Sequence, residues 1–173
     1  MHDQKIRTLV MTALMTALCA VMTMVIKVPS PMGGYFNLGD CGVLLSAWLL
    51  GPGWGAAAAG LGSALADLLG YPLYAPGTLV IKALMAAAAA GLFRLLQGEN
   101  RAHQLTAKVV SGTVAECIMV GGYLAFEGIL LGMGAGALAN IPFNVAQGVV
   151  GVCSAALVMG LLTRVPGLTE VNR

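Results

Sequence analysis

The chain has 173 residues, of which 58% are hydrophobic and only 9% are charged, and its formal net charge is +2. Its mean hydropathy of +0.87 excludes a soluble globular domain and predicts a chain folded in a lipid bilayer, with no nucleic-acid partner. The apolar runs are continuous, which favours helices over a β-barrel. Because a helix of roughly 20 residues crosses the apolar core of a bilayer, the length predicts about six spans in a single domain, residues 1–173.

The predicted elements are long apolar helices separated by breaks rich in glycine and proline. A Pro- and Gly-rich loop at 28–38 follows the first helix, and Gly51-Pro52-Gly53 ends a second segment that is short for a span. Residues 70–77 form the next turn, and 97–104 is the strongly polar stretch. We therefore predict an all-α bundle of six transmembrane helices, at 6–26, 39–50, 54–69, 78–96, 106–131 and 141–162.

The positive charges are distributed unevenly between the predicted loops. Six spans place both termini on one side of the membrane, and the excess of Lys and Arg predicts that this side is cytoplasmic. Only Lys27 lies on the other side, and Lys82 lies within a span. The loops at 28–38, 70–77 and 132–139 are then predicted to face outward. The basic residues assigned to the cytoplasmic side are Lys5, Arg7, Arg94, Arg101, Lys108, Arg164 and Arg173.

Charged side chains interrupt or border the apolar runs, where a charge costs several kcal/mol unless it faces a partner or a cavity. On the fifth helix, Glu116, Tyr123 and Glu127 fall at i, i+7 and i+11, which places them on one face. On the sixth, Asn144 and Gln147 share a face in the same way. The polar stripes of separate helices are therefore expected to face a common interior.

These polar side chains are predicted to lie at a similar depth, in the outer half of the membrane, with Glu116 nearer the middle. Convergence at one depth indicates a pocket that opens outward and takes a small polar molecule. The residues predicted to bind it are Asn37, Asp40, Asp67, Tyr74, Lys82, Glu116, Tyr123, Glu127, Asn144 and Gln147.

A purely structural interpretation is the alternative. The same residues could form interhelical hydrogen bonds and one buried ion pair, for example between Lys82 and Asp67 or Glu116. Asp40 could cap the second helix, Asp67 could bond to the loop at 70–77, and Asn140 could cap the sixth helix. However, three carboxylates around one lysine exceed what a single stabilising pair needs, and this excess favours a functional site.

Several classes of chemistry leave no trace in the sequence. The chain has no phosphate-binding loop or nucleotide fingerprint, and its four cysteines have no metal-ligand spacing. Its two histidines, His2 and His103, lie in polar segments, away from any candidate nucleophile. We therefore expect no enzyme activity, no cofactor and no metal. A pocket without energy-coupling machinery suggests a binding subunit.

Small residues follow one another at a spacing of four on two helices, which lets helix backbones approach closely. Gly55, Ala59 and Ser63 line one face of the third helix, where packing within the chain is the favoured interpretation. On the first helix, Ala13 and Ala17 lie on one face. For them, a contact with another subunit is a real alternative.

Several stretches together resemble the substrate-binding S component of energy-coupling factor (ECF) vitamin transporters, in the riboflavin-transporter-like branch. The resemblance covers nearly the whole chain, and the combination is specific although each piece is short. The stretches are Gly34-Tyr35-Phe36-Asn37-Leu38-Gly39-Asp40, Leu50-Gly51-Pro52, Gly62-Ser63-Ala64-Leu65-Ala66-Asp67-Leu68-Leu69, Tyr74-Ala75-Pro76-Gly77-Thr78-Leu79-Val80-Ile81-Lys82, Ala115-Glu116 to Glu127, and Asn144 to Gly148.

The resemblance implies a six-helix S component in a prokaryotic plasma membrane, with a vitamin pocket near the outer face that the loop after the first helix closes. It implies as partners a transmembrane T component and two ATPase subunits, which supply the energy. The family's Ala-x-x-x-Ala motif, used to dock the T component, matches Ala13 to Ala17. By analogy, the subunit topples in the membrane to release its ligand inward.

The residues leave the ligand open. A buried Lys82 could meet a carboxylate, a phosphate or a carbonyl oxygen, and Glu116 or Glu127 could accept from an aminopyrimidine. Only Tyr123 offers obvious stacking on the pocket face, which favours a ligand smaller than riboflavin. We expect a thiamine precursor of the hydroxymethylpyrimidine type, with pantothenate, a pyridoxine vitamer and riboflavin as further candidates. A stand-alone carrier with Glu116 as its proton site is the alternative function.

Overall fold

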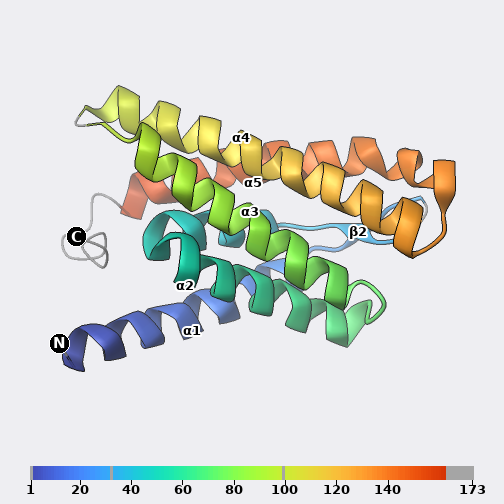
Figure 1. Cartoon of the computed structure of the whole chain (residues 1–173), viewed down its shortest axis with the longest axis horizontal. Coiled ribbons are helices and arrows are strands. Elements are labelled where there is room, and N and C mark those ends of the chain that lie inside the picture. The colour runs from blue at the N-terminus through green and yellow to red at the C-terminus, as the bar shows by residue number, and fades with distance from the viewer. Residues whose placement is uncertain (1, 32, 99, 163–173) are drawn as a thin grey trace.

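The structure, a computed structural model, describes residues 2–31, 33–98 and 100–162 (Figure 1). Long helices account for most of the described residues, and the prediction of a helical membrane fold is confirmed. The two-residue strands, the π-helix and the 3-10 helix were not predicted. The elements are α1 (His2–Val25), β1 (Val28–Pro29), β2 (Tyr35–Phe36), α2 (Gly39–Gly70), α3 (Ala75–Leu96), α4 (Arg101–Ala125), the π-helix η1 (Phe126–Leu130), the 3-10 helix η2 (Gly134–Asn140) and α5 (Ile141–Leu162).

Helix α2 consists of two limbs joined by a sharp reversal. Gly51 adopts a φ of 80° and a ψ of −176° inside it, a conformation suited to glycine, and Pro52 follows. The limbs then pack closely, since a Cβ on Gly55 would lie 2.6 Å from the carbonyl oxygen of Ser46. The limbs correspond to the segments predicted at 39–50 and 54–69, and the break lies at the predicted Gly-Pro-Gly.

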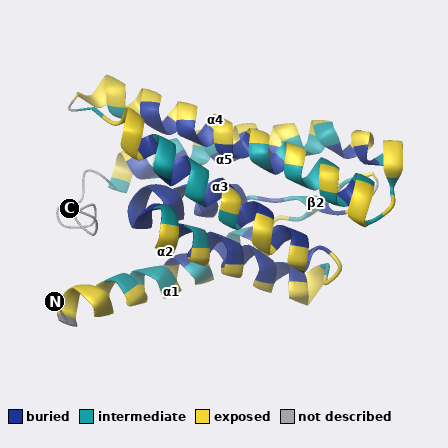
Figure 2. Cartoon of the chain, in the orientation of Figure 1, coloured by how far each residue is buried: buried dark blue, intermediate teal, exposed yellow. Residues whose placement is uncertain are grey.

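The helices run side by side, so that each end of the bundle gathers several helix ends. Helix α1 begins and α5 ends at the left of Figure 1, where α3 ends and α4 begins. The opposite end holds β1, β2, η1 and η2. Helix α2 contacts α1 and α3 extensively, and α4 packs between α3 and α5. The first limb of α2 is the central element, because every residue from 39 to 51 is buried (Figure 2).

The connection between α1 and α2 folds back on itself as a short antiparallel pair. Val28 pairs with Phe36, and Pro29 pairs with Tyr35. Gly33 and Gly34 turn the chain with φ values of 99° and 74°, which other residues rarely adopt. The pair holds residues 28–38 against the end of the bundle, and this position makes the loop part of the site described below.

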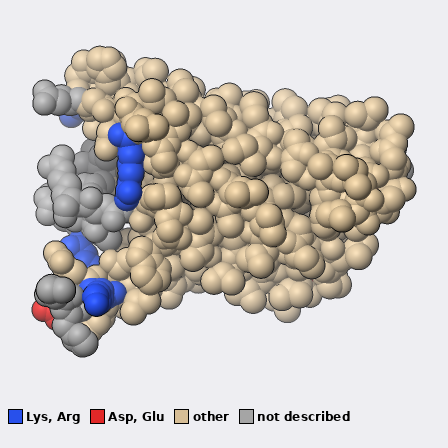
Figure 3. All heavy atoms as spheres, in the orientation of Figure 1, with Lys and Arg blue, Asp and Glu red and all other residues tan. Residues whose placement is uncertain are grey.

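The outer surface of the bundle is apolar. In the described residues, five helices are long and apolar enough to cross a membrane, α2 being counted once despite its reversal. Leu69, Leu95 and Ile129 are each at least three-quarters exposed. Figure 3 shows Lys and Arg gathered at the end where α1 begins, with none on the rest of that face. This pattern is that of a multi-pass membrane protein with one basic end. Arg164 and Arg173 lie outside the described residues.

Candidate functional site

A polar pocket lies at the end of the bundle that holds the β1–β2 pair. Its empty space is about 420 Å³, a volume that includes open solvent. All five helices and the loop at 28–38 contribute side chains or backbone to its wall. The lining residues are Thr23, Ser30, Gly34, Tyr35, Asn37, Ser63, Asp67, Tyr74, Thr78, Lys82, Tyr123, Glu127, Asn144 and Gln147.

Lys82 and Asp40 form an ion pair at the base of the pocket. Their side chains are only 3% and 0% exposed, so the pair is withdrawn from water. The second carboxylate oxygen of Asp40 accepts a hydrogen bond of 2.6 Å from Nε2 of Gln147. Oε1 of Gln147 in turn accepts from the backbone N–H of Asn37 at 2.8 Å and from its Nδ2 at 3.2 Å. This chain of bonds joins α3, the start of α2, α5 and the loop.

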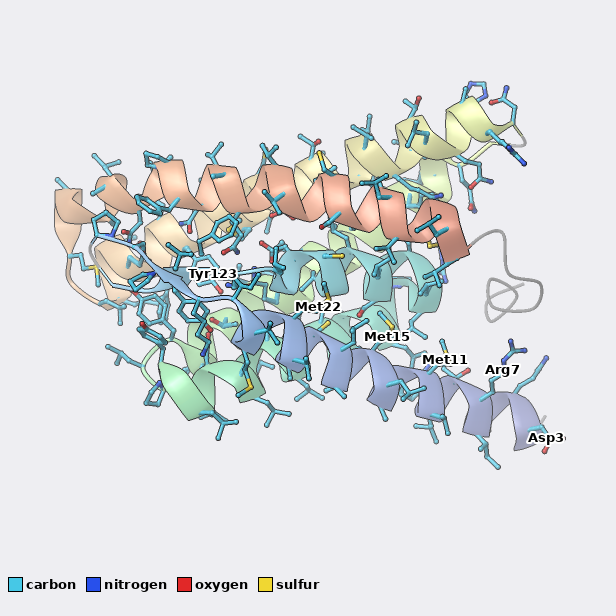
Figure 4. All side chains as sticks on the ribbon, turned by 180° about the vertical axis from the view of Figure 1, so that it is seen from behind. Asp3, Arg7, Met11, Met15, Met22 and Tyr123 are labelled. Carbon is cyan, nitrogen blue, oxygen red and sulfur yellow. The ribbon has the colours of Figure 1, made fainter. Side chains whose placement is uncertain are left out.

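Asp67 anchors a second wall. The Tyr35 hydroxyl donates to its Oδ1, and the Thr78 hydroxyl donates to its Oδ2 at 2.5 Å. The oxygens of Thr78 and Tyr123 are 2.9 Å apart and share a further hydrogen bond. In Figure 4 the labelled Tyr123 ring lies in the interior, between helices. Asp67 is therefore held by hydroxyl groups of the loop and α3, and not by a cation.

Glu127 forms a third wall from the π-helix. Oε1 accepts a hydrogen bond of 3.3 Å from the Tyr74 hydroxyl, and Oε2 accepts one of 2.9 Å from Nδ2 of Asn140. The same Nδ2 donates to the carbonyl oxygen of Gly33 at 3.2 Å, which connects this wall to the loop. Single π-turns interrupt α-helices mainly at functional sites, and here the π-turn carries the pocket carboxylate.

Aromatic side chains and one lysine cover the mouth of the pocket. The Tyr35 and Tyr71 rings have centroids 4.7 Å apart, and Nζ of Lys27 lies 4.6 Å from the Tyr35 centroid, within cation–π range. Burial raises the pKa of the Tyr35 phenol, and the Asp67 hydrogen bond raises it further. Burial likewise raises the pKa of Tyr74, with Glu127 adding to the shift. Both phenols therefore stay protonated and donate.

Two buried side chains near the pocket lack partners. The hydroxyl of Ser63, which lines the pocket, forms no hydrogen bond with a described residue. Neither carboxylate oxygen of Glu116 forms one either. Glu116 lies behind the lining, against α5, where a Cβ on Gly148 would lie 3.2 Å from its Oε2 and one on Gly151 would lie 3.0 Å from its Oε1. Such groups are uncommon in folded proteins and each asks for an explanation.

The structure brings the residues predicted for the site together, with two of them behind the wall. Asp40 does not line the pocket but bonds directly to Lys82 and Gln147, which do. Glu116 also lies outside the lining. The suggested partners of Lys82, namely Asp67 and Glu116, are wrong, because Asp40 forms the ion pair. The cap suggested for Asp40 is also wrong, since Leu38 is the N-cap of α2.

The alternative suggested for Asp67 is wrong, whereas the cap suggested for Asn140 stays a prediction. The Asp67 side chain bonds to hydroxyl groups, while the loop bond from the N–H of Tyr71 goes to its backbone oxygen. The Asn140 side chain donates to Glu127 and to the carbonyl oxygen of Gly33. Sequence reasoning missed Thr23, Ser30, Gly34 and Ser63 as lining residues, and it noted Tyr35 and Thr78 without placing them in the site.

Ala13 and Ala17 lie on the outward side of α1, and both are exposed. The opposite side of the helix carries Met15, which is buried, and Met22, which packs against the core. Figure 4 shows both methionines among the helices, with Arg7 at the far end of α1. The small-residue face of α1 is thus unoccupied by the rest of the described chain.

No group of three or more metal-ligating side chains is placed to hold a metal ion in residues 2–31, 33–98 and 100–162. The site is instead a set of hydrogen-bonding groups around a pocket at one end of an apolar helical bundle. These features define a multi-pass membrane protein with a small-molecule pocket.

Comparison with known proteins identifies the family. The family model for the ECF-type riboflavin transporter S component matches residues 3–164, and the chain belongs to this family. An uncharacterised protein from Pyrococcus woesei is 38% identical over 135 residues, which are 76% of this chain and 85% of the relative. A solved structure described as the S component of a bacterial ECF transporter has the same fold, with a TM-score of 0.69 and 19% identity over 92% of this chain and 97% of the other.

Family membership makes the chain a substrate-binding membrane subunit of an ECF transporter, which is a transport protein and not an enzyme. The resemblance predicted from short sequence stretches is thus confirmed at the level of the family.

Proposed function

We propose that this S component captures a small B-vitamin or vitamin precursor at the outer face of a prokaryotic plasma membrane and delivers it to the cytoplasm. A transmembrane T component and two ATPase subunits supply the energy, since the described chain has no nucleotide-binding motif of its own. The observation that carries the proposal is the pocket, whose wall is built of buried groups such as Lys82, Asp67 and Glu127. Intramembrane ionisable groups are retained chiefly for function.

The proposed topology has six crossings within one domain, residues 1–173, and cytoplasmic termini. The first limb of α2 rises only about 18 Å at 1.5 Å per residue, so the loop at 28–38 completes its crossing. The exposed Lys5, Arg7, Arg94 and Arg101 support this orientation, because they lie on segments that meet at the end where α1 begins. The pocket then opens toward the outside.

The proposed docking site for the T component is the face of α1 that carries Ala13 and Ala17. Small residues at this spacing allow a second helix to approach closely, and both alanines are exposed in the described chain. Replacing both with Leu is expected to abolish uptake while leaving substrate affinity unchanged. Ala13→Leu with Ala17→Leu can be compared with Leu18→Val and Val25→Leu, which alter exposed residues on another side of the same helix. Loss of substrate binding in the double alanine variant would contradict the docking role.

The proposed substrate is a thiamine precursor of the hydroxymethylpyrimidine type, with pantothenate, a pyridoxine vitamer and riboflavin as further candidates. Thermal-shift and native mass spectrometry measurements on the purified subunit against these compounds test the proposal. One compound should raise the unfolding temperature and appear as a bound mass. Failure of all B-vitamins and precursors to bind would contradict vitamin capture.

The alternative function is a stand-alone, proton-coupled carrier. The observation that favours it is the buried and unpartnered carboxylate of Glu116, which is the kind of group that proton relays use. The two functions differ in their need for partners. Uptake that persists in cells lacking the T component and the ATPase subunits would support the carrier, whereas uptake that is lost supports the ECF importer.

A further inference from the structure

The charges around the pocket do not balance. Lys82 is the one cation among the lining residues, and its ammonium is already paired with Asp40. Lys27 lies at the mouth, where it rests on the rings of Tyr35 and Tyr71. In the described residues, the single salt bridge is the one between Lys82 and Asp40. The carboxylates of Asp67 and Glu127 therefore face the pocket without a paired cation.

Both carboxylates use each of their oxygens as an acceptor. Asp67 accepts from two hydroxyl groups, one on each oxygen. Glu127 accepts from Tyr74 on one oxygen and from Asn140 on the other. The amide nitrogen of Asn140 is identified as a donor because it also bonds to the carbonyl oxygen of Gly33. Acceptance at both oxygens is the pattern of an ionised carboxylate, and each oxygen has a second lone pair to offer a ligand.

A third buried carboxyl group, that of Glu116, lies close to the Asp40 and Lys82 pair. Glu116 lies behind the wall near Asp40, as shown by the position of Gly151, whose Cβ would lie 2.8 Å from the Cβ of Asp40 and 3.0 Å from Oε1 of Glu116. The Asp40 and Lys82 charges cancel as a pair, so the two carboxylates of Asp67 and Glu127 face one further lysine, Lys27, which leaves a net charge of −1. Glu116 is counted as neutral, because a second buried charge beside Asp40 is disfavoured. In a setting with little water, such fields are weakly screened.

We propose that this pocket selects a cationic or neutral molecule rich in N–H or O–H donors and rejects carboxylates and phosphates. This inference rests on the proposed capture of a small nutrient. Amines, amino-substituted pyrimidines and protonated ring nitrogens satisfy Asp67 and Glu127 from the pocket side. The unpartnered hydroxyl of Ser63 supplies an additional contact in the same wall. An anion would instead meet two carboxylates, and the only lining cation is already paired.

The selection concerns charge and hydrogen-bonding class, so it separates the proposed vitamin candidates from one another. Hydroxymethylpyrimidine and pyridoxamine carry the required donors. Pantothenate carries a carboxylate and is excluded. Phosphorylated forms of any of these vitamins are excluded for the same reason.

The test uses matched pairs that differ in charge at one position. Affinities of the purified, full-length subunit are measured by isothermal titration calorimetry or native mass spectrometry for pyridoxamine against 4-pyridoxic acid, panthenol against pantothenate, and hydroxymethylpyrimidine against its phosphate. In every pair that binds, the member without the acid group is expected to bind at least tenfold more tightly. An acid or phosphate that binds as well as its partner would overturn the selection but leave vitamin capture standing. Binding of no compound in any pair and of no other B-vitamin, riboflavin included, would contradict vitamin capture itself.

Charge-neutralising variants locate the source of the discrimination. Asp67→Asn and Glu127→Gln are each expected to reduce the preference within a pair at least fivefold, mainly by weakening the donor-rich member. Asp3→Asn removes an equal charge from an exposed residue at the opposite end of α1 and should leave the preference unchanged. If one pocket variant folds poorly, the preference can still be measured in the other. An unchanged preference in a folded pocket variant would overturn the assignment to these carboxylates.

Discussion

The bundle interior near the start of α1 is mostly apolar, with Lys108 as its buried charged residue, whereas the interior at the other end is lined with several charged and hydrogen-bonding groups. At the first end, Phe93, Ala107 and Met159 pack in the core, and the indole N–H of Trp48 finds a single partner in the hydroxyl of Ser111 at 3.1 Å. At the second end, Lys82 and Asp40 are paired and several further carboxylates remain without a cation.

The first end contributes stability through packing, whereas the second end sacrifices some stability for binding groups. Apolar packing costs little to maintain in a membrane protein, while each buried polar group requires a partner. Changes at the apolar end should therefore alter stability alone. Changes at the pocket end should alter both stability and affinity, and in some cases in opposite directions.

The largest expected effect comes from Lys82→Met at the pocket end. Removing the ammonium leaves Asp40 buried without its counter-charge, and breaking a buried pair in this way costs about 3–5 kcal/mol. The free energy of unfolding in detergent should fall by this amount, and substrate binding should be lost. Combining Lys82→Met with Asp40→Asn removes both charges and should recover most of the stability. Equal stability of the single and double variants would contradict the pairing.

Gly151→Ala tests the packing behind the pocket. The new Cβ would lie 2.8 Å from the Cβ of Asp40, so α5 must shift away from the start of α2. Overpacking of this kind costs about 1–3 kcal/mol, and the shift should also weaken binding by displacing the bond between Gln147 and Asp40. Gly160→Ala makes the same change on α5, at a position where the new Cβ would meet no described atom of another part of the chain within 4 Å. Stability that falls equally in both variants would point to a helix effect unrelated to the pocket.

Much of the fold could be predicted because glycine, proline and apolar runs act locally. Gly51 and Pro52 end one helical limb and begin another with no help from distant residues, and the break was found at that position. The π-turn at Phe126–Leu130 was not predicted, because it depends on packing between elements. A Cβ on Gly77 would lie 2.6 Å from the ring of Phe126, so α3 and η1 approach closely at that point.

The residues of the site could be predicted, but their pairings could not. Helical spacing places Lys82 and Glu116 on inward faces, yet it does not say which helix lies opposite each one. Lys82 meets Asp40 because the first limb of α2 occupies the centre of the bundle, a tertiary fact. Ser63 was interpreted as part of a small-residue packing face, since a lone serine between Gly62 and Ala64 carries no sequence pattern that separates packing from binding.

Ser111→Ala sharpens the comparison from the apolar end. The buried indole N–H of Trp48 would lose its hydrogen-bond partner, which should cost about 1–2 kcal/mol of the free energy of unfolding. Substrate affinity should stay at the level of the unmodified protein, because neither residue lines the pocket. Thr113→Ala removes an exposed hydroxyl from the same helix and should change neither property. A clear loss of affinity in Ser111→Ala would show that the two ends are coupled.

The smallest expected effect is also the most diagnostic, because Ser63→Ala should move stability and affinity in opposite directions. The Ser63 hydroxyl is buried and bonds to no described residue, so removing it should leave the ligand-free protein as stable or slightly more stable. If a substrate supplies the missing hydrogen bond, its loss should weaken binding by about 2- to 12-fold, equivalent to ~0.5–1.5 kcal/mol. Thermal unfolding without ligand and titration with the identified substrate measure the two effects separately.

Ser46→Ala is the matched control on the same helix. Its hydroxyl is also buried, but it donates to the backbone oxygen of Gly42 at 2.7 Å and does not line the pocket. Losing that bond should lower stability slightly and leave affinity unchanged, which is the reverse of the pattern expected for Ser63. If Ser63→Ala instead lowers stability and spares affinity, then Ser63 belongs with Ser46 and Ser111 as a structural residue. The part of α2 that faces the substrate would then be Asp67 alone, beside the lining residues of α1, the loop, α3, α4, η1 and α5.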